Sequence, residues 1–528
     1  MVAQGRSLHA KALKPHVMFQ SLTTPVLVEA ARERIAGLFR EHAEWFCTAG
    51  RGETYALSRD EMELSVAHGR LMLSCWTEKG SRLWRILGWE WNGEMLLLQA
   101  SRRLGAELPL IELVPRASAL AVAATIRTAR QVRCEKLARL ACAAQPDTRI
   151  ERCALNRGTR PSQPGRYARI IVHRKHTRIA VCGPVVASQP ASVDAFLSST
   201  LLWFKRTADR ARPPYIEQLW LLVSDELLKP LLYRVALLRD GLREQIRVFV
   251  VDKDLINLTP AEPLERRDLW KKKLASFPPV PAAMITTQTS AIVAEAPEAI
   301  DVVHSRHGET LRYFGLPFAR VRTLLGVEKV WFGLDHAHRR LLDESNRREW
   351  EDLLHDLRVH RSAFAIDHRH AFYRSAAEAW LESLLRRDIT KLDPGLIIAP
   401  LHAQFRTARG GKLGIRPIDL LALRQDGRLV VIELKVYEDR EHVLQGADYW
   451  RRVEAHRRRG HIARAKLFGD LQIKDEPPLV YLVAPTLRVH PSFTALARCI
   501  ASDIEIYRFD INEDWRTGVR VMRRMRVN

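Results

Sequence analysis

The chain has 528 residues and a formal net charge of +23. This length corresponds to about three domains, and the charge favours a polyanionic partner, although an arginine-rich proteome would give the same balance. The seven cysteines form no C-x-x-C pair, which does not suggest a disulfide framework or a structural zinc, and no uncharged apolar run approaches the roughly 20 residues that span a bilayer, so we expect no membrane helix.

The N-terminal residues, Met1 to Phe19, contain no continuous apolar segment, so we expect no signal peptide and a cytoplasmic protein. Residues 1–117 are predicted to form a helix at Val26–Glu44 and then a β-meander, with a turn at Asn92-Gly93. Its tryptophans either fill a core or stack on bases; they are Trp76, Trp84, Trp89 and Trp91. The expected strands are Met62–Ala67, Leu71–Trp76, Leu83–Trp91, Met95–Gln99 and Leu108–Val114.

Residues 118–255 are predicted to form a separate α/β domain. A helix at Ser118–Ala144 is followed by a polar segment, Gln145–Gly165, that we expect to be a loop. The remaining elements are a hairpin (Ala168–His173 and Arg178–Cys182), a helix (Val193–Arg206), a strand (Gln218–Val223), a helix (Leu227–Arg243) and a strand (Ile246–Val251).

Residues 256–298 are rich in Pro, Ala and Thr and are expected to be a linker. Residues 299–370 are expected to be a mixed α/β connecting region, with a strand at Lys329–Gly333 and a helix at Ser345–Leu357. Residues 371–528 form the last predicted domain. Its expected order is helix (Ser375–Arg387), strand (Leu396–Phe405), hairpin (418–436), helix (Arg440–Arg459), strand (Leu479–Val483), helix (Ser492–Ala501) and strand (Ile504–Phe509).

The hairpin carries the most informative charges. Its turn, Gln425-Asp426-Gly427, suits a three-residue loop, and pairing Arg424 with Arg428 places Asp419 opposite Glu433. Because side chains alternate along a strand, Glu433 and Lys435 point to the same face. Carboxylates on a buried face are costly unless a cation compensates them, and a divalent ion between hard oxygen ligands does so. The alternative is a salt-bridged sheet edge without chemistry.

The order of these elements resembles the PD-(D/E)xK nuclease superfamily, with its restriction-endonuclease-like α/β/α core. Pro417-Ile418-Asp419 and Glu433-Leu434-Lys435 are similar to its two acidic motifs. Gln445-Gly446-Ala447-Asp448-Tyr449 looks like the Q-x-x-x-Y helix of the RecB-like branch and of mismatch-cutting endonucleases, and 378–382 looks like their E-x-x-L-E helix.

The resemblance implies a catalytic site in the C-terminal domain. Mg²⁺ or Mn²⁺ would be held by Asp419, Glu433, the main-chain carbonyl of Leu434, and Glu378 or Glu382. Family pattern favours Glu378, and Glu382 would then be a solvated helix residue. Lys435 would orient or activate the attacking water. Gln445 would orient Lys435 or a phosphate, and Tyr449 would pack under the site or touch the nucleic-acid backbone; alternatively, both residues only pack the helix on the sheet.

Basic residues cluster around these motifs and would contact phosphates. They are Arg406, Arg409, Lys412, Arg416, Arg451, Arg452, Arg457 and Arg458. The leading hypothesis is therefore a metal-dependent DNA nuclease of repair, recombination or defence, and a homodimer is possible. The alternatives are a catalytically inactive nucleic-acid-binding protein and an RNA-processing endonuclease.

The middle domain repeats the predicted order of the C-terminal core, namely hairpin, helix, strand, helix, strand. Its second hairpin strand, Ile179-Ala180-Val181-Cys182, carries no acidic residue. We therefore hypothesise a second, degenerate nuclease-like core that serves as a scaffold or a nucleic-acid platform.

Overall fold

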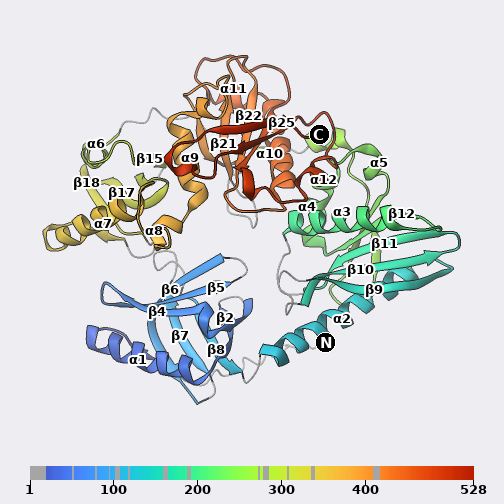
Figure 1. Cartoon of the computed structure of the whole chain (residues 1–528), viewed down its shortest axis with the longest axis horizontal. Coiled ribbons are helices and arrows are strands. Elements are labelled where there is room, and N and C mark those ends of the chain that lie inside the picture. Colours follow the sequence, from blue (N-terminus) through green and yellow to red (C-terminus); the bar gives the residue numbers. More distant parts are fainter. Residues whose placement is uncertain are drawn as a thin grey trace, which may run out of the picture. The chain divides into compact units, whose positions relative to one another are not determined.

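The chain is a mixed α/β protein, described here from a computed structural model (Figure 1). The structure describes residues 19–49, 53–77, 80–93, 95–101, 108–116, 119–157, 164–186, 192–271, 274–277, 285–305, 308–334, 339–407 and 417–528. These residues form four sheets and fall into two compact units, one built on residues up to Ile126 and one on residues from Arg127 onward.

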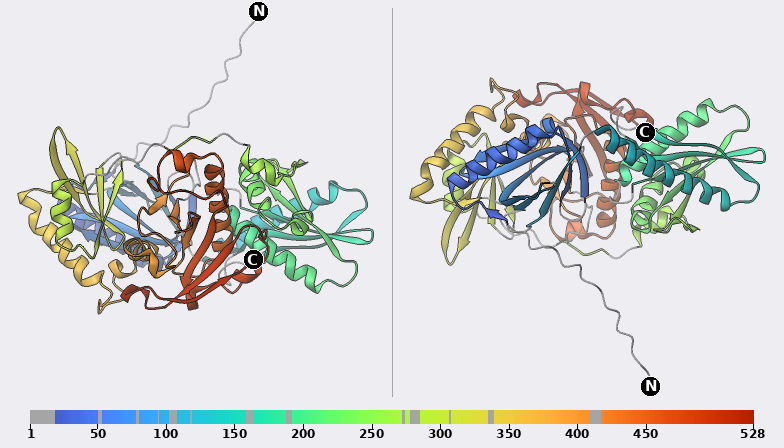
Figure 2. Two further views of the ribbon diagram at one scale, coloured as in Figure 1. Left: turned by 90° about the horizontal axis from the view of Figure 1, so that it is seen from above. Right: turned by 90° about the horizontal axis from the view of Figure 1, so that it is seen from below.

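The first unit is an antiparallel sheet with helix α1 (Pro25–Glu41) packed on one face (Figure 2). The strand order is β3-β2-β8-β7-β6-β5-β4, with β1 (Gln20–Ser21) beside β6. Trp84 and Trp89 are buried in its core, so these two tryptophans fill a core and are not free to stack on bases. The strands are β2 (Glu44–Ala49), β3 (Glu53–Ser58), β4 (Met62–Ala67), β5 (Arg70–Thr77), β6 (Gly80–Trp91), β7 (Leu96–Ser101) and β8 (Leu110–Arg116).

The boundary between the units falls within helix α2 (Ala119–Ala143), and the second unit continues with a six-stranded sheet, β14-β13-β12-β11-β10-β9. Its strands are β9 (Thr148–Arg157), β10 (Pro164–Arg174), β11 (Thr177–Pro184), β12 (Ile216–Val223), β13 (Ile246–Val251) and β14 (Leu258–Pro260). Its helices are α3 (Val193–Arg210), α4 (Asp225–Val235) and α5 (Asp240–Arg243). The expected loop at Gln145–Gly165 is wrong, since β9 lies there. Strand β9 lies at the edge of the sheet, where charged side chains are common, so its charged sequence did not indicate a strand.

A five-stranded antiparallel sheet follows, in the order β15-β16-β17-β18-β19. Its strands are β15 (Ile300–Ser305), β16 (Gly308–Tyr313), β17 (Leu316–Leu324), β18 (Val327–Phe332) and β19 (Arg340–Leu341). Helix α6 (Thr287–Ala294) precedes this sheet and lies inside the segment expected to be a linker. Its N-cap is Thr286, whose Oγ1 accepts a hydrogen bond from the Thr289 amide. Helix α7 (Arg347–His360) follows the sheet and confirms the amphipathic helix expected there.

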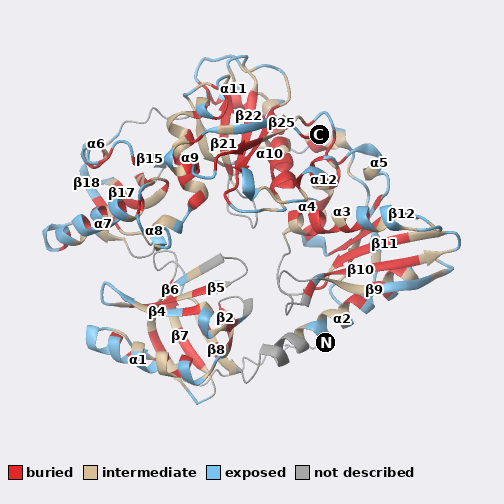
Figure 3. Ribbon diagram, viewed as in Figure 1, coloured by how far each residue is buried: buried red, intermediate tan, exposed pale blue. Residues whose placement is uncertain are grey.

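The last sheet is again six-stranded, in the order β20-β21-β22-β23-β24-β25. Its strands are β20 (His402–Phe405), β21 (Ile418–Leu423), β22 (Leu429–Leu434), β23 (Leu479–Pro485), β24 (Ile506–Ile511) and β25 (Val521–Arg526). Its helices are α8 (Ala371–Arg374), α9 (Ala377–Arg387), α10 (His442–Arg457), α11 (His461–Arg464) and α12 (Phe493–Ala497). The central strands are buried on both faces (Figure 3), which explains their continuous apolar sequence.

The two six-stranded sheets have the same topology. In each, the first three strands are antiparallel neighbours, the next two pairings are parallel, and the last strand is antiparallel. Side chains of α3, α4, α10 and α12 share one apolar cluster with strands of both sheets. The element order predicted for the middle domain is therefore confirmed. The two domains that share this order pack against each other through their helices.

Candidate active site

The register of the hairpin is the one that its sequence predicts. The Arg424 amide donates to the Arg428 carbonyl at 2.9 Å, and Leu420 pairs with Ile432. Continuing this register by one residue brings Asp419 opposite Glu433. Gly427 has φ of +82°, the left-handed conformation that a glycine adopts without strain and that closes this short loop.

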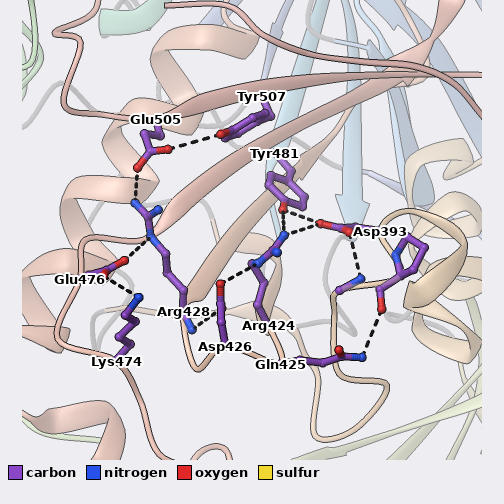
Figure 4. A network of polar contacts seen from close by, with 12 residues as sticks. Asp393, Arg424, Gln425, Asp426, Arg428, Lys474, Glu476, Tyr481, Glu505 and Tyr507 are labelled. Carbon is purple, nitrogen blue, oxygen red and sulfur yellow. Dashed lines mark hydrogen bonds and ion pairs between the residues drawn. The ribbon is translucent and has the colours of Figure 1, made fainter.

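The turn end of the hairpin is held by a polar network (Figure 4). Arg424 Nη1 donates to Asp393 Oδ2 at 2.8 Å, and the Tyr481 hydroxyl donates to the same oxygen at 2.6 Å. Arg428 Nη2 donates to Glu505 Oε1 at 2.6 Å. Because the turn is tied to neighbouring elements, a register slip that would separate Asp419 from its partner is opposed.

The charged end brings three of the predicted catalytic groups together. Asp419 Oδ2 accepts from the Leu434 amide at 2.8 Å, and Lys435 Nζ donates to Glu433 Oε1 at 2.7 Å and to the Leu434 carbonyl at 3.3 Å. Glu433 and Lys435 are buried, whereas Asp419 is half-buried. The three side chains therefore share one site.

The ionisation of this site reflects two facing carboxylates. Burial, followed by the charge of Asp419, raises the pKa of Glu433 well above its usual value. Burial lowers the pKa of Lys435, but the charges of Glu433, Glu378 and Asp419 outweigh it, so that pKa is raised. Lys435 is therefore a cation at any physiological pH, and added positive charge between the carboxylates would favour the ionised form of Glu433.

Helix α9 contributes two glutamates in different environments. Glu378 is half-exposed and lies 4.0 Å from Lys435 Nζ. Glu382 is buried, so the expectation that it is a solvated helix residue is wrong: it accepts from Gln404 Nε2 at 2.6 Å, and Arg312 lies 3.5 Å away. Burial raises the pKa of Glu382. The helix faces the five-stranded sheet as well as the last sheet, and the sequence pattern could not show that second contact.

Gln404 is a site residue that the sequence did not reveal. Its Nε2 lies 3.5 Å from Asp419 Oδ1 and bonds Glu382, so it links the two carboxylates. Its φ is +49°, in the left-handed region that glutamine seldom adopts. A polar residue between Ala403 and Phe405 was the one available signal.

Helix α10 closes the other side of the site. Gln445 is buried, and its Nε2 lies 3.5 Å from Glu441 Oε2. Tyr449 is buried in the apolar cluster beneath the hairpin. His442 Nε2 lies 3.2 Å from the Glu433 carbonyl oxygen, and burial with the charge of Lys435 lowers the pKa of His442 to about 3. His442 is thus neutral and fixes the strand that carries Glu433.

The arginines of α10 differ from the expected open phosphate-binding surface. Arg451 Nη2 lies 2.6 Å from Asp448 Oδ1, Arg452 bonds the same carboxylate, and Arg457 Nε lies 2.6 Å from Glu454 Oε2. All three guanidinium groups are largely buried, so we leave them out of the proposed nucleic-acid interface.

Two other predicted basic residues stay candidates for phosphate contact. Arg458 pairs with Glu454 but is half-exposed, and Arg406 is exposed beside β20. Arg409, Lys412 and Arg416 lie outside the described residues.

The oxygen atoms at this site match the needs of a hard divalent ion, which the sequence implies. The described residues contain no group of three or more His, Cys, Asp or Glu side chains placed to hold a metal. Mg²⁺, however, is commonly bound by one or two carboxylates, with water and substrate oxygens completing its shell. Asp419, Glu433 and the Leu434 carbonyl supply such oxygens, and burial together with the charge of Asp419 raises the pKa of Glu433.

Comparison of the chain with protein-family models finds no match, and neither does comparison with curated proteins. Among solved structures, the chain is similar to EndoMS in its apo form, with 10% sequence identity and a TM-score of 0.13. The likeness covers 41% of this chain and 93% of that one, and at such a TM-score it carries no argument. Separately, none of the helices formed by the described residues combines the length and the apolar character needed to cross a membrane.

Proposed function

We propose that this protein is a metal-dependent nuclease that hydrolyses phosphodiester bonds of DNA. The supporting observation is the convergence of Asp419, Glu433 and Lys435 at one end of a hairpin whose register is fixed at the other end. A purely structural ion pair needs one carboxylate for one ammonium group. Burial and then the charge of Asp419 raise the pKa of Glu433, and the presence of a second carboxylate is explained if a cation binds between the two.

Asp419, Glu433 and the Leu434 carbonyl would hold Mg²⁺ or Mn²⁺, and Glu378 is near enough to join through a bridging water. When bound, the ion would act as a Lewis acid toward the scissile phosphate and lower the barrier for attack by water. Gln404 and Glu382 would keep Asp419 oriented by hydrogen bonds, as second-layer groups commonly do for carboxylate ligands.

Lys435 is proposed to act as a fixed cation. Its raised pKa keeps it protonated, so it donates hydrogen bonds and stabilises negative charge on the attacked phosphate, and it does not remove a proton from water. Its bond to Glu433 holds the ammonium group on the side of the hairpin where a phosphate would have to lie.

DNA is the proposed substrate because the chain carries +23 net charge and exposes Arg406 beside β20. Repair, recombination and defence are the processes in which such an activity would serve. The RNA-processing alternative and the inactive binding protein are decided by the same assay, since they predict cleavage of RNA alone or cleavage of nothing.

The assay incubates the purified chain with matched single- and double-stranded DNA and RNA, with Mg²⁺ or with EDTA. We expect cleavage of DNA that requires the metal and falls at least 100-fold in Asp419→Ala and in Lys435→Ala. Asp426→Asn is the matched control, because Asp426 lies in the turn of the same hairpin and bonds Arg428. Unchanged cleavage in both site variants would overturn the proposal.

A further inference from the structure

The two six-stranded cores are arranged as a dimer within one chain. Helix α4 of the first core packs on α10 of the second, and α12 of the second packs on α3 of the first. By their place between equivalent strands, α3 corresponds to α10 and α4 to α12. The contacts are therefore reciprocal, as in an interface between two identical subunits related by a twofold axis.

The centre of this interface shows the same symmetry in its hydrogen bonds. Leu238 and Ile500 form an antiparallel bridge, and each follows the second helix of its own core. The Arg239 amide donates to the Cys499 carbonyl at 2.9 Å, and the Ala501 amide donates to the Leu237 carbonyl at 3.0 Å. Equivalent segments that meet each other in this way place a pseudo-twofold axis at Leu238 and Ile500.

The pseudo-twofold identifies the position in the first core that corresponds to the candidate site. Glu433 of β22 pairs with Leu482 in the next strand, and Cys182 of β11 pairs with Leu221. Both leucines face the shared apolar cluster. Cys182 thus takes the place of Glu433, and its cross-strand partner Arg169 takes the place of Asp419.

Among the described residues, the two positions that correspond to Asp419 and Glu433 carry no carboxylate. Arg169 presents a guanidinium group and lies 3.4 Å from Ser199 Oγ, while the Thr200 hydroxyl donates to Cys182 Sγ at 3.2 Å. Burial raises the pKa of Cys182 to about 11, so the sulfur stays a thiol. The positive charge of Arg169 and the neutral thiol of Cys182 disfavour a hard divalent ion such as Mg²⁺, for which Asp419 and Glu433 supply oxygen ligands in the other core.

We propose that the chain is a single-chain pseudo-dimer with one hydrolytic site, and that it therefore cuts one strand of duplex DNA. This rests on the proposed function. The two strands of a duplex are related by twofold symmetry, so a symmetric pair of active cores offers one site to each strand. Here the first core keeps the fold and the pseudo-twofold arrangement but lacks the metal-binding carboxylates. The expected product is therefore a nick in one strand.

The test follows supercoiled plasmid DNA with Mg²⁺ under single-turnover conditions with protein in excess. Nicked circles should accumulate to near completion, with linear DNA arising only later from independent nicks. Asp419→Asn should abolish nicking, whereas Cys182→Ser should nick at the wild-type rate, because Cys182 lies in the position without ligands. Light scattering on the purified protein without DNA should give the mass of one chain.

Each result separates the two proposals. Linear DNA formed together with nicked circles, or a loss of nicking in Cys182→Ser while the fold is retained by circular dichroism, would overturn the single-site inference and leave the nuclease proposal standing. An absence of any cleavage of plasmid and oligonucleotides would overturn the proposed function and the inference with it.

Discussion

Asp448 provides a quantitative test of how the two cores are held together. Its carboxylate is fully buried and is surrounded by three guanidinium groups: Arg451 Nη2 at 2.6 Å, Arg234 Nη1 of α4 at 3.0 Å, and Arg452. Arg234 also bonds Asp194 of α3. The change Asp448→Asn keeps the side-chain size and removes one charge from a site that joins α10 to the first core.

The magnitude follows from the removal of one buried negative charge. Removing one member of a buried ion pair costs about 3–5 kcal/mol, because the remaining charge is left without compensation. Arg234 keeps Asp194, whereas Arg451 and Arg452 each lose the negative charge of Asp448. We therefore expect Asp448→Asn to lower the free energy of unfolding of the second unit by about 4 kcal/mol.

The pH dependence of this difference has a defined sign. Burial opposes ionisation of Asp448, but Arg234, Arg451 and Arg452 outweigh it and lower its pKa well below the usual value. An acid whose pKa falls on folding stabilises the folded chain above its unfolded pKa of about 3.9, and this contribution is lost as the pH drops below that value. The difference between wild type and variant should be constant from about pH 8 to pH 5 and should shrink below about pH 4.

The assay is urea unfolding of both proteins at several pH values, monitored by tryptophan fluorescence. Asp475→Asn is the matched control, because Asp475 also pairs with an arginine of α10 but its side chain is 99% exposed. Its effect should stay below about 0.5 kcal/mol. A loss of less than about 1 kcal/mol in Asp448→Asn, or a difference that grows as the pH falls, would refute the reasoning.

Three further predictions concern the site itself. Gln404→Ala should lower the cleavage rate about 10-fold at saturating Mg²⁺ with little change in melting temperature, since Gln404 positions Asp419; equal rates would contradict this role. Mg²⁺ at ten times its Kd should stabilise the wild type by about 1.4 kcal/mol and leave Asp419→Asn unchanged in a thermal shift assay, and an equal shift in both would place the ion elsewhere. Gly315→Ala should destabilise the chain by about 2–4 kcal/mol, because a Cβ there would lie 2.0 Å from the Ala379 carbonyl oxygen of α9. The control is Gly326→Ala, which has the same φ of +78° but open space around it and should cost about 1 kcal/mol. Equal losses of stability in urea unfolding would exclude the clash.

The sequence determined the local geometry of the candidate site. A short turn ending in glycine fixes the register between β21 and β22, and register alone brings Asp419 opposite Glu433 and Lys435 to the same face. Helices with strong apolar periodicity, such as α7 and α9, were equally predictable. These features depend on neighbours within a few residues, so the pattern of the chain is sufficient to specify them.

Contacts between distant segments were decided only by the tertiary structure. Gln404 of β20 joins Asp419 of β21 to Glu382 of α9, and the sequence around these three residues does not show that they meet. Arg451 and Arg452 of α10 were expected to face a polyanion, but α4 and α3 pack on this helix and both arginines pair with the buried Asp448. Whether a charge is buried or solvated depends on what packs over it, and that is set by long-range packing that one-dimensional periodicity does not encode.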